Sequence, residues 1–234
     1  PAGPCHVADL NPPQKAAVTY IEGPLLVLAG AGSGKTRLIT YKISYLIERC
    51  GLAPSHIAAV TFTNKAAREM RERVGRLLRG RDSRGLRIST FHTLGLNILR
   101  RELSAAGLRS GFSIFDEQDV EPVLRELAKK NDADNAALQR ARAQISDLKH
   151  DLADPDQASR TAEDDQSAFH AALYGAYQRA LRAYNAVDFD DLILQPVLAL
   201  QDSEKPVRSS AAWALGTLGV IEAVDPLLVM LQYG

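Results

Sequence analysis

The sequence has few cysteines and lacks a long apolar run. Its two cysteines, Cys5 and Cys50, form neither the spacing of a zinc site nor a disulfide framework, which fits a reducing compartment. No apolar stretch reaches the ~18 residues that a membrane span requires. The first residues show no signal-peptide pattern. These absences lead us to expect a cytoplasmic protein that does not enter a membrane.

The sequence also lacks net charge, because 28 lysines and arginines balance 28 aspartates and glutamates. No global basic field therefore indicates a nucleic-acid partner. The distribution is uneven, since residues 68–101 are crowded with arginine and residues 147–165 are rich in aspartate. A local basic face can bind phosphate groups even when the total is zero, but a solvated helix face gives the same pattern. The 234 residues, 46% of them apolar, suffice for one or two globular domains.

A glycine-rich stretch is the most informative part of the chain. Residues 25–36 read Leu-Leu-Val-Leu-Ala-Gly-Ala-Gly-Ser-Gly-Lys-Thr. The apolar run 25–28 has the length and composition of a buried parallel strand, and a helical pattern continues from Lys35 through Arg49. Strand, loop and helix in this order are the context of a phosphate-binding loop. A flexible turn with a chance Gly-Lys-Thr is the less favoured alternative.

The chemistry of phosphate binding requires these residue types. Glycines without a Cβ let backbone N–H groups approach phosphate oxygens at a helix N-terminus, whose dipole favours anions. Lys35 would bind the outer phosphates of ATP, and the Thr36 hydroxyl would ligate Mg²⁺. The usual pattern begins with glycine where this chain has Ala29. The loop residues that we expect around the nucleotide are Ala29, Gly30, Ala31, Gly32, Ser33, Gly34, Lys35 and Thr36.

A helix is predicted just before the loop, over residues 10–18. Asn11 is its expected N-cap, and Pro12 lies in its first turn. Gln14 lies on this helix, where its amide could reach a nucleotide bound to the loop. An exposed glutamine on a helix is more often only solvated, so the residue type alone does not assign this role.

Two further strand-to-helix units follow. Residues 57–63 form a strand candidate followed by a helix capped by Thr63 or Asn64, and residues 86–90 form a third short strand followed by a helix through Leu103. Three such units predict right-handed crossovers and a parallel sheet, whose ligands gather at the carboxyl ends of the strands. We expect the glycine-rich loop to lie at these strand ends, together with residues 62–64 and 91–92. Taken singly, Phe62, Phe91 and His92 fit ordinary core positions at least as well.

The rest of the chain is predicted to be mainly helical. Residues 116–181 have a helical pattern, with loops near residues 131–135 and 154–166, and they show no strand signal. This region is interpreted as a helical insertion. Residues 187–194, Val-Asp-Phe-Asp-Asp-Leu-Ile-Leu, close it with an aspartate cap that leads into an apolar helix.

Five segments together resemble the amino-terminal half of a superfamily 1A DNA helicase of the Rep/UvrD/PcrA type. They come in the family's order and at plausible spacings, and the resemblance covers about residues 9–198. The segments are residues 10–18, 25–36, 60–70, 88–100 and 187–194.

The resemblance implies roles for individual residues. Gln14 corresponds to the glutamine that reads adenine, Lys35 and Thr36 to the catalytic lysine and the Mg²⁺ ligand, and Arg37 to an arginine that contacts the nucleotide. Asp188 to Asp191 correspond to an element near the DNA path. The residues implied to bind single-stranded DNA, through aromatic stacking and phosphate contacts, are Phe62, Thr63, Asn64, Thr90, Phe91 and His92.

The fold class expected is α/β, with four parts. Residues 1–111 would hold a partial RecA-like P-loop parallel sheet, and residues 112–186 a helical subdomain like the family's 1B insertion. Residues 187–200 would form a junction helix that returns to the first domain. Residues 201–234 would form a HEAT-like helical hairpin.

The family's second acidic motif, a hydrophobic strand ending in Asp-Glu shortly after Asp-Phe-Asp-Asp, is not found. The pair Asp116-Glu117 is similar, but a helical pattern starts at once, so Asp116 is better interpreted as an N-cap. The second motor domain with its arginine fingers is not found either. A general base contributes about 10²–10⁴-fold and an arginine finger about 10³–10⁵-fold, so we expect at most a very slow ATPase.

The last residues have a different character. Residues 206–219, with Pro-Val-Arg, an alanine-rich helix and Ala-Leu-Gly, resemble a HEAT-type repeat of the phycobilisome-lyase kind, and residues 222–232 would be its second helix. One hairpin cannot bury its apolar face alone. It must therefore pack on the helicase-like part near an open sheet edge, on further repeats, or on a protein partner.

Three functions are compatible with these patterns. The chain is an ATP- and single-stranded-DNA-binding part of a helicase that is deficient in hydrolysis and unwinding. Alternatively, it is a true ATPase whose missing parts come from a partner chain. In the third interpretation, the HEAT-like tail is an interaction module and the P-loop is vestigial.

Overall fold

The computed structural model describes residues 9–30, 32–78, 83–129 and 135–201, and the predicted HEAT-like hairpin lies almost wholly outside these residues. The described part of the chain forms two compact units, residues 9–94 and 95–201. The boundary falls inside helix α4 (Phe91–Arg101). None of the described helices combines the length and apolarity needed to cross a membrane.

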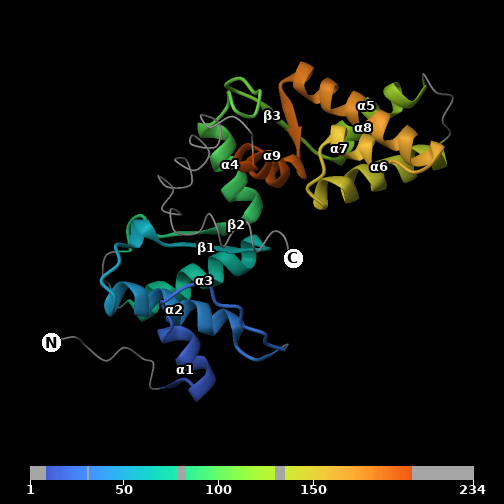
Figure 1. The fold of residues 1–234 in the computed structure, drawn as a ribbon. Helices are drawn as coiled ribbons and strands as arrows, with labels where there is room; N and C mark the ends of the chain where they lie inside the picture. Colours follow the sequence, from blue (N-terminus) through green and yellow to red (C-terminus); the bar gives the residue numbers. More distant parts are fainter. Residues whose placement is uncertain (1–8, 31, 79–82, 130–134, 202–234) are drawn as a thin grey trace. The chain divides into compact units, whose positions relative to one another are not determined.

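The first unit contains helices and one pair of short strands (Figure 1). Its elements before α4 are α1 (Pro12–Thr19), α2 (Lys35–Glu48), the 3-10 helix η2 (Pro54–His56), β1 (Ala58–Thr61), α3 (Asn64–Leu77) and β2 (Arg87–Thr90). The strands pair in parallel, with Thr61 opposite Thr90. Helices α2 and α3 pack beside them around Ile43, Met70 and Val74. The buried residues of α3, Ala67, Met70 and Val74, are three and four positions apart and so form one stripe that faces the core.

The predicted helix starts of this unit are confirmed. The Asn11 side chain accepts a hydrogen bond from the Gln14 N–H, and the Gln14 side chain accepts one from the Asn11 N–H. Together the two bonds complete a capping box. Thr63 caps α3 by accepting from the Ala66 N–H at 3.1 Å. Each cap satisfies donors that the helix itself cannot pair.

The strand predicted at residues 25–28 is wrong, because the structure has no regular strand there. The side chains of Leu26 and Leu28 are 83% and 88% exposed. The ladder of the first unit's described residues joins only β1 and β2. A parallel strand exists only when a neighbour accepts and donates its backbone hydrogen bonds. The apolar run therefore specifies strand-like residues but not the partner that would make it a strand.

The second unit is mainly helical, as expected. Its helices after α4 are α5 (Glu117–Lys129), α6 (Asn135–His150), α7 (Pro155–Arg160), α8 (Asp165–Tyr184) and α9 (Asp191–Gln201). Tyr174, Tyr177 and Leu181 of α8 lie at the centre of its core. Helix α7 lies within the loop predicted over residues 154–166, so that part of the prediction is wrong. Asp154 as N-cap and Pro155 at the first position are the signals that begin this helix.

Two strands of three residues each complete the second unit. Strand β3 (Ser113–Phe115) comes directly before the Asp116 N-cap, and β4 (Ala186–Asp188) is not predicted by the sequence. They pair in parallel, with Phe115 opposite Asp188. The carboxyl end of β3 thus meets the start of the Asp-Phe-Asp-Asp element.

Candidate nucleotide and nucleic-acid site

The glycine loop has the backbone conformation that only glycine adopts easily. Gly32 and Gly34 have φ angles of 77° and 83°, in the left-handed region, and Gly34 is the N-cap of α2. The Lys35 ammonium donates to the carbonyl oxygens of Ala29 at 2.8 Å and Gly30 at 3.1 Å. The Ser33 hydroxyl also donates to the Gly30 oxygen, at 2.7 Å. The loop therefore curls around the lysine at the N-terminus of a helix, where an anion is favoured.

Gln14 joins α1 to this loop. Its Nε2 donates to the Ser33 carbonyl oxygen at 3.2 Å, while its Oε1 accepts from the Asn11 N–H at 3.3 Å. The amide thus reaches the loop, as the sequence predicts. Its role in reading adenine stays a prediction.

Arg37 and Thr36 follow the lysine in the first turn of α2. Arg37 is exposed, donates to the Asp9 carbonyl oxygen at 3.2 Å, and lies with its guanidinium 5.3 Å from the centre of the Tyr41 ring. Thr36 is half-buried. Ala31, another predicted nucleotide residue, lies outside the described residues.

The donor set fits a magnesium ion that arrives with a triphosphate. No group of three or more histidines, cysteines, aspartates or glutamates that could hold a metal occurs in the described part of the chain. Mg²⁺ usually keeps several waters and takes few protein ligands besides substrate phosphates. The hydroxyl of Thr36, next to Lys35 at a helix N-terminus, is a suitable single ligand for such an ion.

Two aromatic side chains meet at the carboxyl ends of β1 and β2. Phe62 follows β1 and Phe91 follows β2, and their ring centres lie 5.5 Å apart at an interplanar angle of 46°. Phe62 is 86% exposed, so most of its ring faces solvent. Thr63 and Asn64 are exposed beside it, at the start of α3. Exposed aromatic rings can stack bases, and polar side chains at a helix N-terminus beside them can contact phosphates.

The remaining residues predicted to contact DNA are less exposed. Thr90 is buried, and its Oγ1 lies 2.9 Å from the Thr93 Oγ1 and accepts from the Thr93 N–H at 3.2 Å. This side chain therefore stabilises the first turn of α4. His92 is half-buried in the same turn. Their contribution to nucleic-acid binding stays a prediction.

The arginines of α3 differ in what they contact. Arg71 donates to the Ile88 carbonyl oxygen at 2.7 Å and so holds α3 against β2. Arg68 is exposed, and Arg73 lies 3.9 Å from the Glu69 carboxylate. The helix thus has one structural arginine and a solvated basic surface.

The Asp-Phe-Asp-Asp element contains two buried carboxylates. Asp188 and Asp191 both lie against the Lys149 ammonium, at 2.6 and 3.0 Å. Tyr177 donates its hydroxyl to Asp188 at 2.9 Å, and Gln178 donates its amide to Asp191 at 2.9 Å. Burial raises the pKa of Asp191, while the nearby ammonium opposes that shift. Burial, with the Asp188 charge, also raises the pKa of the Tyr177 phenol.

The sequence interpretation named Asp188 and Asp191 but missed Lys149, which pairs with both of them. A usable signal was present in α6, whose buried residues are Leu138, Ala141, Ile145 and Lys149. A lysine on the apolar stripe of a helix needs a buried acidic partner. The pair Asp188 and Asp191, at the start of an apolar helix, meets that need.

Asp116 and Glu117 have structural roles in the second unit. The Asp116 carboxylate accepts from the N–H groups of Gln118 at 2.8 Å and Asp119 at 3.2 Å, which confirms the predicted N-cap. Glu117 lies 2.9 Å from the Arg142 guanidinium. The strand before them, β3, pairs with β4 and not with the strands that follow the glycine loop.

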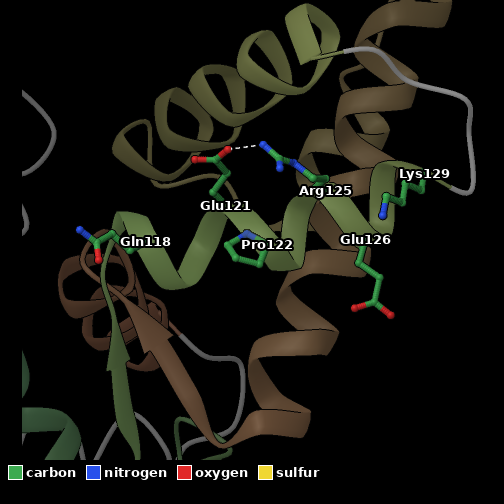
Figure 2. A pocket seen from close by; sticks show the side chains of 6 residues that line it. All are labelled: Gln118, Glu121, Pro122, Arg125, Glu126 and Lys129. Carbon is green, nitrogen blue, oxygen red and sulfur yellow. Dashed lines mark hydrogen bonds and ion pairs between the residues drawn. The ribbon is translucent and has the colours of Figure 1, made fainter.

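A separate hollow lies along one face of α5 in the second unit (Figure 2). Glu121 and Arg125, one turn apart on α5, form an ion pair, as Figure 2 shows. Its lining is Gln118, Glu121, Pro122, Arg125, Glu126 and Lys129. Charges of both signs on one helix give this hollow no evident preference for a nucleotide.

Two family models match the chain. Residues 10–213 match the UvrD/REP helicase N-terminal domain, and residues 207–233 match the PBS lyase HEAT-like repeat. The second match agrees with the repeat expected from the sequence, although its residues lie outside those that the structure describes.

The curated relatives that the chain resembles are named as ATP-dependent DNA helicases. The chain is 53% identical over 197 residues to the ATP-dependent DNA helicase Rep of Escherichia coli (strain K12), covering 84% of this chain and 29% of that protein. It is 52% identical to Rep of Salmonella typhimurium, with the same coverage. It is 40% identical over 193 residues to the ATP-dependent DNA helicase PcrA of Staphylococcus epidermidis, covering 82% of this chain and 26% of that protein.

The chain thus spans less than a third of the length of these relatives. The UvrD/REP match extends over residues 10–213 of the chain's 234, and the glycine loop and the strand ends described above both lie within it. The chain therefore belongs to the UvrD/REP helicase family.

Proposed function

We propose that these 234 residues bind ATP with Mg²⁺ at the glycine loop and single-stranded DNA at the carboxyl ends of β1 and β2. They would act as the corresponding part of a Rep/UvrD-type ATP-dependent DNA helicase. The loop carries this proposal: two left-handed glycines open α2, and Lys35 turns back onto the loop carbonyls. That arrangement is the one a triphosphate requires.

Each nucleotide-binding residue has a defined task in this proposal. Backbone N–H groups at the start of α2 bind the phosphates, and Lys35 exchanges its loop carbonyls for the outer phosphate oxygens. Gln14, held at the loop by Ser33, reads the adenine, and Arg37 contacts the nucleotide. Mg²⁺, held by Thr36, would neutralise phosphate charge when bound.

The DNA-binding surface would combine stacking with phosphate contacts. Phe62 offers an exposed ring supported on one side by Phe91. A stacked base contributes about 1–3 kcal/mol by alanine substitution. Thr63 and Asn64, at the start of α3, supply a hydroxyl and an amide for the phosphate backbone.

We further propose that these residues by themselves hydrolyse ATP very slowly and do not unwind DNA. Asp116 and Glu117 are engaged as an N-cap and an ion pair, so they do not supply the acidic motif that polarises water. The matched relatives extend well beyond the covered 29% of their length. A general base and an arginine finger, worth about 10²–10⁴-fold and 10³–10⁵-fold, would have to come from outside these residues.

Two other functions differ in what they require. An active ATPase completed by a partner polypeptide would bind ATP in the same way and gain turnover when that polypeptide is added. The HEAT-like match at residues 207–233 favours an interaction module whose P-loop is vestigial. That module would bind a protein and not ATP.

Equilibrium binding of a fluorescent ATP analogue tests the proposal. Lys35→Ala should weaken binding at least tenfold, because the outer phosphates lose their cation. Lys129→Ala is the matched control, since this exposed lysine lies in α5 of the second unit. Binding that survives Lys35→Ala would support the vestigial P-loop. Steady ATP turnover by the purified chain, stimulated by single-stranded DNA, would refute the proposed deficiency.

A further inference from the structure

A lysine without solvent contact lies at the centre of the second unit. The Lys149 side chain is 0% exposed, and its ammonium lies 2.6 Å from the Asp188 carboxylate and 3.0 Å from the Asp191 carboxylate. It also lies 5.1 Å from the centre of the Tyr177 ring. Burying a charged ammonium is unfavourable unless its partners compensate fully, and apolar residues often replace such an ion pair without loss of stability. Stability alone is therefore a weak explanation for this lysine.

The two carboxylates that Lys149 binds also shape the turn between β4 and α9. The Asp191 N–H donates to the Asp188 carboxylate at 2.9 Å, and the Asp188 N–H donates to the Asp191 carboxylate at 3.4 Å. Tyr177 and Gln178 of α8 add one donor to each carboxylate. Residues 188–191 are thus fixed from α6 on one side and from α8 on another.

The middle two residues of the same turn, Phe189 and Asp190, are more exposed than Asp188 and Asp191 on either side of them. Phe189 is 54% exposed. Asp190 accepts from the Ser146 hydroxyl at 2.8 Å and lies 3.4 Å from the His150 imidazole, so the last turn of α6 also holds this side of the turn. Phe189 and Asp190 line a hollow shared with Phe115 and Ile145.

We propose that Lys149 is a positioning residue: it draws Asp188 and Asp191 inward and thereby holds Phe189 outward, where its ring can stack on a base of single-stranded DNA. This inference rests on the proposed DNA-binding function. Lys149 touches no nucleic acid itself and acts only through the turn. Tyr177 assists it through the hydrogen bond to Asp188.

Amide hydrogen exchange in the absence of DNA tests directly whether Lys149 fixes the turn at residues 188–191. Lys149→Met removes the ammonium but keeps an unbranched apolar side chain, so exchange of the amides in residues 188–192 should accelerate at least tenfold. Lys129→Met, at an exposed lysine of α5, should leave these rates unchanged. Tyr177→Phe removes one hydroxyl only and should give a smaller acceleration in the same segment. It serves as the test variant if Lys149→Met does not fold. Unchanged exchange in a folded variant would overturn the proposal.

A double-mutant cycle on oligonucleotide affinity separates positioning from general stability. Phe189→Ala should weaken binding about fivefold or more in the parent chain, as expected for one stacked base. In the Lys149→Met background it should weaken binding less than twofold, because the ring is no longer held in place, and in the Tyr177→Phe background the loss should be intermediate. An equal Phe189→Ala effect in the parent chain and in the Lys149→Met chain would overturn the positioning role. A parent chain that binds no oligonucleotide overturns the proposed function instead, and the exchange rates still decide whether Lys149 fixes the turn.

Discussion

The ring of Phe62 packs 5.5 Å from the ring of Phe91, although the two residues follow different strands. The parallel register of β1 and β2, with Thr61 opposite Thr90, brings them together. Phe62 nevertheless stays 86% exposed, so the pair leaves one large aromatic surface open to solvent. An exposed ring held by a neighbouring ring is suited to stacking a base.

Phe62→Ala should weaken binding of a single-stranded oligonucleotide by about 5- to 150-fold, which corresponds to ~1–3 kcal/mol for one stacked base. Fluorescence anisotropy at several salt concentrations measures this effect. Phe62→Tyr keeps a stacking ring and should bind within about threefold of the parent chain. Equal affinity of parent and Phe62→Ala, or binding that does not weaken with salt, would contradict the DNA assignment.

Gln14→Glu should weaken ATP binding about 3- to 10-fold while leaving helix α1 intact. Glutamate can still accept the Asn11 N–H in the capping box, but it cannot donate to the Ser33 carbonyl or to adenine. Competition against a fluorescent ATP analogue gives the affinity. Inorganic tripolyphosphate, which has no base, should compete equally well in both proteins. An equal loss for tripolyphosphate would mean that Gln14 supports the loop rather than reads the base.

Gly95→Ala should destabilise the chain by about 1–3 kcal/mol or more, because a Cβ at this position would overlap the Leu192 carbonyl group. Gly75→Ala is the matched control on α3, where a Cβ would meet nothing within 4 Å. It should stabilise its helix by up to about 1 kcal/mol. Urea unfolding midpoints distinguish the two. A Gly95→Ala chain as stable as the parent would show that α4 and α9 do not pack closely.

Local signals predicted much of this fold. The caps at Asn11, Thr63 and Asp116 depend on contacts two or three residues away, which a short sequence window contains. Strands β1 and β2 were also predictable, because each lies between clear helix signals. Their parallel pairing then placed Phe62 beside Phe91 without further information.

Features that depend on distant partners were not predictable. Residues 25–28 have strand-like composition, but pairing depends on another segment, and the structure leaves Leu26 and Leu28 exposed. Lys149 binds a carboxylate 39 residues away, so the local pattern of α6 marks a buried lysine but does not identify its partner. The short strand β4 likewise exists only through its pairing with β3. Long-range pairing is what a single sequence specifies least directly.

The stability of the second unit should fall as the pH drops below about 6.5. His170 is buried in α8, and burial, with the charge of Arg140 nearby, lowers its pKa from 6.5, while Asp164 opposes this shift. The folded protein therefore keeps the imidazole neutral at a pH where the unfolded chain takes up a proton. Stability from this group is fully present above the unfolded pKa and is lost as the pH falls through it.

His170→Gln, which cannot titrate, should reduce that pH dependence between pH 7 and pH 5.5. The expected loss in slope is below the limit for one proton, about 1.4 kcal/mol per pH unit. Urea unfolding at several pH values, detected with a spectroscopic probe in the second unit, measures this pH dependence of the free energy of unfolding. His56→Gln, at an exposed histidine in η2 of the first unit, should leave the slope unchanged. If His170→Gln retains the parent's slope, the acid sensitivity arises from groups other than this imidazole.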